Sequence, residues 1–361
     1  MQFAYSAELR PGLRIAKPIY NKDGVLLCKQ NSRLTLPAIN SIQSSDLSGI
    51  YILEPAESAP MLTPEDIAFE QAQTIYLFKL KDIFEKIYKR QPIGQLDSIV
   101  EDVLKRYGHI RHRVNFNQNL RTSHDFMYKH ATSVAILSTL IGQHIDIPED
   151  DFKALIAASI LYCFGYRFMA NNAMDKQSAL EKGTAYLSMI TDRLSYLPKA
   201  LRIVEYFILS NNPERTVQPP SEDIILLSEI LKVSVEFDLL TSIAKGQEPQ
   251  SELLAINAMK ARSTDFNDRI VNIMAHCLCL IPSGSTVTLN NNEKALVLEE
   301  NSQDYMHPIV FRLHDKSLCN LYDSSIGTKL YITDLVKTED NRIEINQKSL
   351  DAYNERKNTQ S

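Results

Sequence analysis

The chain has 361 residues, of which 44% are hydrophobic and 23% are charged, and its formal net charge is −5. This is the composition of an ordinary soluble globular protein, and the length is sufficient for two or three domains. The mixed charges give no general footprint of nucleic-acid binding, so we expect no DNA partner.

No apolar run approaches the ~20 residues that a membrane helix requires, and the N-terminus lacks the layout of a signal peptide. We therefore expect a cytoplasmic protein without a membrane span. The five cysteines are scattered, which argues against a disulfide framework. Cys277 and Cys279 form a C-x-C pair beside His276, but no second cysteine pair completes a metal shell. Buried structural thiols are the favoured interpretation.

Residues 1–55 are predicted to form a small β-rich module. Strand-like apolar residues over 9–20 are followed by a hairpin signal at 21–24, a short helix over 36–42 and a strand over 49–53.

Residues 56–92 are interpreted as a linker and a connecting helix. The composition over 55–60, Pro-Ala-Glu-Ser-Ala-Pro, is typical of a linker. The helix is indicated by Thr63 as its N-cap and by Pro64 in its first turn.

Residues 93–280 carry apolar side chains at helical spacing, with Pro148, Pro198 and the pair at 219–220 as breaks between helices. This pattern predicts an all-α domain.

Residues 281–338 have the shorter period of strands. The pattern predicts a hairpin over 286–298 and further strands over 307–313 and 330–332. The segment 339–361 is a polar tail, which we expect to fray. The predicted fold class is therefore mainly α, with a helical bundle flanked by an N-terminal β-rich module and a C-terminal β-hairpin extension.

Two segments of the helical region carry a family resemblance. Tyr128, His130, Val134 and Ala135 match a Tyr-x-His-Ser-x-x-Val-Ala-like run, and the segment 160–166 stands where a Leu-Leu-His-Asp-Ile-Gly-Lys run would follow. This resembles the HD-GYP branch of the HD phosphohydrolases, bacterial enzymes that hydrolyse cyclic di-GMP with two or three metal ions. The resemblance implies an HD-type bundle. The N-terminal module and the β tail also resemble segments that accompany HD-GYP domains, whereas the non-catalytic HD-related output domain is an alternative classification.

The resemblance implies that most metal ligands are missing. His130 stands at the first ligand position, and Val235 replaces the final aspartate. An ambiguity of one residue leaves open whether Asn211 and Asn212, or Asn212 and Pro213, replace a histidine pair. The full set of vestigial site positions is His130, Tyr162, Cys163, Ala179, Asn211, Asn212 and Val235.

The replacements are poor ligands for the iron or manganese that the family would use. Tyr162 has a reference pKa near ~10, and Cys163 is a soft donor in a site built for oxygen and nitrogen. Ala179 takes a histidine position by alignment to Gly183. We therefore expect no metal cofactor, and His130 alone is better interpreted as a satisfied buried histidine.

A basic stretch precedes this region and has two interpretations. It could bind an anionic ligand, or it could be a solvated polar face, and the second is favoured. Its members are Arg106, His109, Arg111, His112, Arg113, Arg121 and His124.

The leading hypothesis is a catalytically inactive HD-GYP-like protein that acts as a regulatory or protein-interaction module in bacterial signalling. One alternative is a non-hydrolysing nucleotide sensor with a cyclic dinucleotide as ligand, for which Glu214 and Arg215 would be contacts and Tyr162 a stacking residue. The other alternative is residual phosphodiesterase activity. We expect the side chains of His130, Tyr162, Asn212 and Val235 to converge on one point. The sequence does not determine the partner or the oligomeric state.

Overall fold

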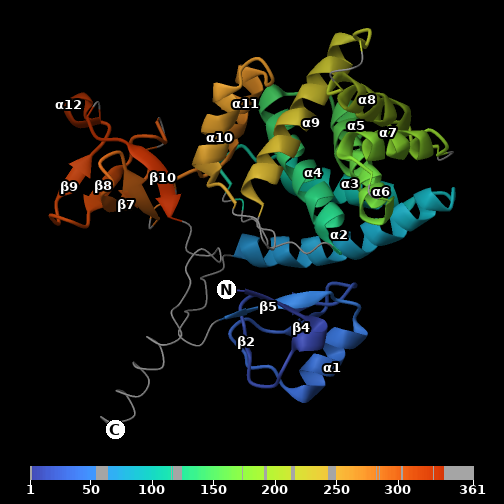
Figure 1. Ribbon diagram of the computed structural model, residues 1–361, viewed down its shortest axis with the longest axis horizontal. Helices are drawn as coiled ribbons and strands as arrows, with labels where there is room; N and C mark the ends of the chain where they lie inside the picture. Colours follow the sequence, from blue (N-terminus) through green and yellow to red (C-terminus); the bar gives the residue numbers. More distant parts are fainter. Residues whose placement is uncertain are drawn as a thin grey trace. The chain divides into compact units, whose positions relative to one another are not determined.

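The computed structural model is mainly α, with small sheets near both ends of the described chain (Figure 1). The chain divides into two compact units, one built on Met1–Ile75 and the other on Tyr76–Lys245 and Pro249–Val336. The structure describes residues 2–53, 64–114, 116, 124–172, 174–190, 193–212, 216–242, 249–281, 283, 285–301, 304–327 and 329–336.

The first unit is a small β-rich module. Its three-stranded antiparallel sheet has the order β1-β5-β2, and β3 pairs with β4. The predicted turn forms as expected, because the side chain of Asn21 accepts a hydrogen bond of 2.9 Å from the Val25 amide and Gly24 has a positive φ of 77°. The elements are β1 (Gln2–Tyr5), η1 (Ser6–Glu8), β2 (Arg14–Ile15), β3 (Ile19–Tyr20), β4 (Leu26–Cys28), α1 (Leu36–Ser44) and β5 (Gly49–Leu53).

Helix α2 (Pro64–Tyr88) is continuous over 25 residues, and its first half belongs to the module. Glu70 forms a mostly buried ion pair of 2.7 Å with Lys17. The side chain of Gln71 donates a hydrogen bond of 2.6 Å to the carbonyl of Gly24. The predicted N-cap Thr63 and the predicted linker lie outside the described residues.

The second unit contains the helical bundle. Helix α4 packs against α3, α5, α9 and α11, and its side chains are buried on all sides over most of its length. Pro148 and Pro198 stand at the starts of α5 and α8, where the missing amide proton costs no hydrogen bond. The elements are α3 (Gln95–Tyr107), α4 (Phe126–Ile145), α5 (Glu149–Leu161), η2 (Tyr162–Tyr166), α6 (Arg167–Asn172), α7 (Lys176–Leu187), α8 (Leu197–Ser210), α9 (Glu222–Thr241), α10 (Glu252–Ala261) and α11 (Asp268–Cys277).

Among the described helices, one segment is long and apolar enough to cross a membrane by length and composition. It is Glu149–Met169, and 83% of its most apolar window is buried inside the protein. Core helices of soluble proteins have the same properties. Inspection of apolar runs in the sequence did not indicate this segment.

The second unit ends in a five-stranded antiparallel sheet of order β10-β6-β7-β8-β9. The predicted hairpin is present as β6 and β7, and its turn is closed by Asn292 in the left-handed region with φ of 65°. Strand β9 was not predicted. The polar tail 339–361 lies outside the described residues. The elements are β6 (Thr286–Leu289), β7 (Lys294–Glu299), β8 (Ile309–Arg312), β9 (Leu318–Asn320), α12 (Ser324–Gly327) and β10 (Ile332–Val336).

Candidate functional site

The candidate site is a buried chain of three polar side chains from three elements. His130 lies in the second turn of α4, Asp238 near the end of α9, and Tyr162 at the start of η2. The Nδ1 atom of His130 is 2.5 Å from Oδ2 of Asp238, and its Nε2 atom is 2.5 Å from the hydroxyl of Tyr162. Both ring nitrogens of His130 therefore have a partner within the protein.

The direction of these hydrogen bonds follows from the chemistry of the partners. Burial, with smaller contributions from Cys163 and Tyr166, raises the pKa of the Tyr162 hydroxyl well above its ordinary value. The hydroxyl thus keeps its proton and donates it to Nε2 of His130. An ionised Asp238 carboxylate can only accept, so Nδ1 of His130 donates to it. A neutral imidazole with its proton on Nδ1 satisfies both contacts.

Aromatic rings enclose this network. Phe126 stacks on His130 with the ring centroids 5.4 Å apart, and Tyr166 meets the imidazole edge-on at 5.8 Å. Phe207 meets Tyr162 edge-on at 5.4 Å. The relative exposure is 0% for His130, 0% for Asp238 and 1% for Tyr162. The network therefore offers no atom to a substrate.

Tyr166 follows Gly165, the glycine of η2. Its hydroxyl is buried. Burial is the main cause that raises the pKa of this hydroxyl, and the charges of Cys163 and Asp238 act in the same direction, whereas the neighbouring Tyr162 hydroxyl acts in the direction that lowers this pKa. Tyr166 therefore contributes a neutral ring rather than a positive charge.

Two glycines bring η2 and α7 into backbone contact. A Cβ atom added to Gly183 would lie 2.6 Å from Cα of Gly165, and one added to Gly165 would lie 2.7 Å from Cα of Leu180. Such distances are too short for any side chain, so this packing requires glycine at both positions. Ala179, which is fully buried, is held beside η2 by this contact.

The other sequence-predicted positions do not belong to the chain of three side chains formed by His130, Asp238 and Tyr162. Cys163 is fully buried in η2, and Val235 is buried in α9, three residues before Asp238. The side chain of Asn211 donates a hydrogen bond of 2.6 Å to the carbonyl of Phe207, at the end of α8.

Asn212 is directed towards a different helix, because its amide donates a hydrogen bond of 2.9 Å to Glu181 in α7. Of the four side chains expected to converge, His130 and Tyr162 are in direct contact. The predicted ligand contacts Glu214 and Arg215 lie outside the described residues.

Sequence reasoning did not identify Asp238 as a functional residue. The residue was visible as part of the Phe237-Asp238 pair, but it was used only to align the helix. A signal was present, because an aspartate three residues after Val235 shares a helix face with it. A carboxylate on an otherwise apolar helix face is expected to have a buried partner.

The residues around His130 do not fit a di-metal centre. Both imidazole nitrogens are engaged, and Val235 and Ala179 have no donor atom in their side chains. Within the described ranges, no three or more His, Cys, Asp and Glu side chains lie together in a group that could hold a metal ion.

The basic stretch before α4 is largely tied to its surroundings. Arg106 pairs with Asp102 at 2.9 Å, and Arg111 pairs with Asp146 at 2.8 Å. These two pairs neutralise two arginines of the stretch and favour the interpretation as a polar face. Arg121 lies outside the described residues.

The C-x-C pair is not arranged as a metal-binding pair. Cys277 is buried, with its sulfur 3.3 Å from Nδ1 of His144, and burial raises the pKa of its thiol to about 12. The thiol therefore stays protonated at neutral pH, whereas metal binding uses the thiolate. Cys279 is half-buried.

No family model matches the chain, and comparisons with curated proteins and with solved structures gave no significant match. The functional interpretation therefore depends on the residues of this chain.

Proposed function

We propose that this chain is a catalytically inactive relative of the HD-GYP phosphohydrolases and acts as a regulatory or protein-interaction module in cytoplasmic bacterial signalling. The observation that carries this proposal is the contact between the Tyr162 hydroxyl and Nε2 of His130.

The contact has the arrangement expected of a replaced metal. In metal sites, a ligand histidine usually donates one ring N–H to a carboxylate while the other nitrogen binds the metal. Asp238 has the carboxylate role on Nδ1 of His130. The Tyr162 hydroxyl then takes the position of the metal on Nε2 and brings aromatic volume that fills the space. The helix-to-helix contact that a metal would provide is thus made by a hydrogen bond.

Hydrolysis of a phosphodiester is disfavoured by the same residues. The reaction requires an activated water and stabilisation of charge on the phosphoryl oxygens. Tyr162 is neutral and buried, Tyr166 is neutral with a buried hydroxyl, and Val235 is apolar. His130, Asp238 and Tyr162 are at most 1% exposed, so these side chains are not placed to activate a water molecule.

The sensor alternative is also weakened at this site. A base that stacks on an aromatic side chain needs an exposed ring face. Tyr162 is only 1% exposed, and its ring already contacts Phe207 and His130.

A role in protein interaction is supported by the C-terminal sheet region. Several large apolar side chains there are exposed, and a partner that covers them would remove apolar area from water. They are Leu298, Leu313, Leu318, Tyr322 and Tyr331.

The proposal is tested by metal analysis of the purified full chain, combined with assays of cyclic di-GMP binding and turnover. We expect no turnover, and a melting temperature that does not change when a chelator is added. Stoichiometric iron or manganese together with turnover would contradict the proposal. Tight binding of cyclic di-GMP without turnover would favour the sensor instead.

A further inference from the structure

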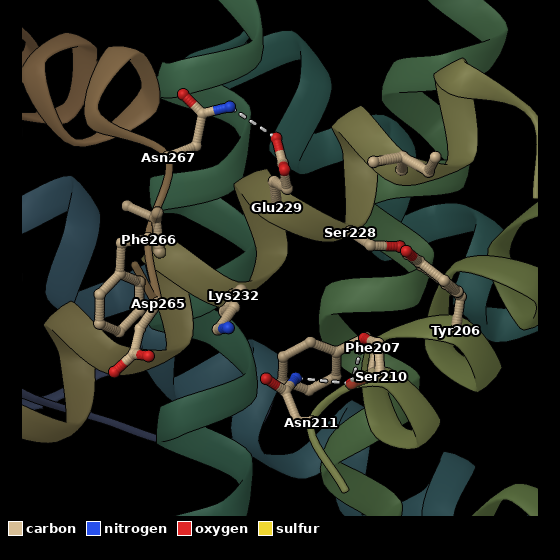
Figure 2. Close-up of a pocket in the computed structure, with 12 residues that line it drawn as sticks. Tyr206, Phe207, Ser210, Asn211, Ser228, Glu229, Lys232, Asp265, Phe266 and Asn267 are labelled. Carbon is tan, nitrogen blue, oxygen red and sulfur yellow. Dashed lines mark hydrogen bonds between the residues drawn. The ribbon is translucent and has the colours of Figure 1, made fainter. Parts of the chain in front are cut away.

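A cleft separate from the buried network lies between α8, α9 and the turn that joins α10 to α11 (Figure 2). Its volume is about 180 Å³. Since a water molecule occupies about 30 Å³ in the liquid, this is the volume of about six water molecules, which suits only a small ligand. Phe207 and Phe266 provide apolar walls.

Most polar groups of the cleft are already engaged. Glu229 accepts a hydrogen bond of 2.7 Å from the amide of Asn267, and Asp265 pairs with Arg262 at 3.1 Å. The amide of Asn211 donates to a main-chain carbonyl. These groups need no ligand to satisfy them.

Two donors remain. Within the described ranges, the ammonium of Lys232 has no ion-pair partner, although Glu229 and Asp265 line the same cleft. Its Nζ atom lies 5.4 Å from the centroid of the Phe266 ring, a cation–π contact that holds the charge at the cleft wall. The hydroxyl of Tyr206, which is half-buried, also has no hydrogen-bond partner among the described residues. Figure 2 shows the Lys232 amine pointing into the space between the Phe266 and Phe207 rings.

The charges of the cleft select the class of ligand. The unpaired ammonium of Lys232 attracts an anion, whereas the carboxylate of Glu229 has only a neutral amide as its partner and repels one. A dianion such as phosphate would double both the attraction to Lys232 and the repulsion from Glu229, and it has no apolar group to contact the two aromatic walls. A single negative charge joined to an apolar group matches one cation between two aromatic walls.

We propose that this cleft binds a small organic carboxylate, with its oxygens accepting hydrogen bonds from Lys232 and its apolar group lying against Phe207 and Phe266. This inference does not depend on the proposed function, because none of the three residues of the buried network lines the cleft.

The test is isothermal titration calorimetry of the full chain with benzoate, with benzylamine and inorganic phosphate as comparison probes. The binding free energy that each heavy atom of a small ligand can contribute allows a dissociation constant in the millimolar range or tighter. We expect saturable binding of benzoate, and binding at least about tenfold weaker for benzylamine and for phosphate. Phosphate binding as tight as benzoate binding would overturn the assignment, as would the absence of benzoate binding.

Variants inside and outside the cleft show whether benzoate binds at this site or elsewhere on the protein. Lys232→Gln removes the positive charge but keeps a polar side chain, and it should weaken benzoate binding by about tenfold or more. Glu229→Gln removes a repulsive charge and should strengthen binding. The matched control is Lys260→Gln on α10, a half-buried lysine that does not line the cleft, and this change should leave the affinity unaltered. Equal benzoate affinity in Lys232→Gln and in the unchanged protein would refute the proposal.

Discussion

Replacing Tyr162 by phenylalanine removes one hydroxyl and tests the central hydrogen bond of the site. The ring stays in place, so its contact with Phe207 is kept and no large cavity forms. Nε2 of His130, which is fully buried, then loses the partner that lies 2.5 Å away. An unsatisfied buried polar atom costs about 1–3 kcal/mol. We therefore expect Tyr162→Phe to lower the free energy of unfolding by that amount.

Truncation of the same residue should cost more. Tyr162→Ala removes the hydroxyl and also leaves a cavity where a side chain with 1% exposure was packed. Large-to-small changes of buried aromatic residues cost about 3–5 kcal/mol. Because the total stability of a folded domain is about 5–15 kcal/mol, both variants should still fold.

The assay is urea unfolding followed by far-UV circular dichroism, since the chain contains no tryptophan. The matched control is Tyr206→Phe, which removes a hydroxyl that has no partner in the described part of α8 and its surroundings. This control should change the stability by less than about 0.5 kcal/mol. If Tyr162→Phe is as stable as the unchanged protein, the hydroxyl does not satisfy His130 and the argument for a replaced metal is wrong.

Three further changes test other parts of the structure by the same unfolding measurement. Gly183→Ala would place a Cβ atom 2.6 Å from the backbone of η2 and should cost more than about 2 kcal/mol of stability. The control Gly94→Ala, where nothing lies within 4 Å of the added atom, should cost little. Equal effects of the two changes would contradict the close packing of α7. The hydrogen bond from Lys199 is the main cause that lowers the pKa of Asp223 to about 2, so Asp223→Asn should cost less than about 1 kcal/mol at neutral pH because the pair is partly exposed. This difference should vanish as the pH falls from about 4 to about 2, since the folded pKa lies below the unfolded one, and a difference that persists at pH 2 would contradict the assigned pair. Burial raises the pKa of Cys277 to about 12, so the thiol ionises in the unfolded chain before it does so in the folded protein, and the stability should fall as the pH rises from about 9 towards 12. Cys277→Ala should make this loss of stability smaller. An unchanged pH dependence in that variant would show that the thiol ionises as freely as in the unfolded chain.

Local elements with a strong chemical signal could be predicted from the sequence. The hairpin at Asn21 forms because the asparagine side chain and a glycine with positive φ both stabilise that turn. The starts of α5 and α8 were visible because proline is tolerated only in the first turn of a helix. Strand β9 has three residues and no period that a sequence pattern could reveal.

The candidate site was predicted less well, because periodicity identifies a buried face but not the partner across the core. His130 was expected to be buried and satisfied, and the interaction was found on α9, 108 residues away in the chain. The resemblance directed attention to Val235, where it implies a missing ligand, rather than to Asp238 on the same helix face. Asn212 was expected at the site and instead contacts Glu181, because its place after the end of α8 turns its amide towards α7.

The burial of His130 explains why its two partners matter for the stability of the core. A histidine with 0% exposure in an apolar core is costly unless both ring nitrogens have partners. If a metal is lost while the histidine stays, Nε2 becomes an orphan unless a donor appears opposite it. Tyr162 supplies that donor together with ring volume, so one substitution both satisfies the histidine and fills the space. The contacts of His130 with Asp238 and Tyr162 are thus explained by the stability of the core.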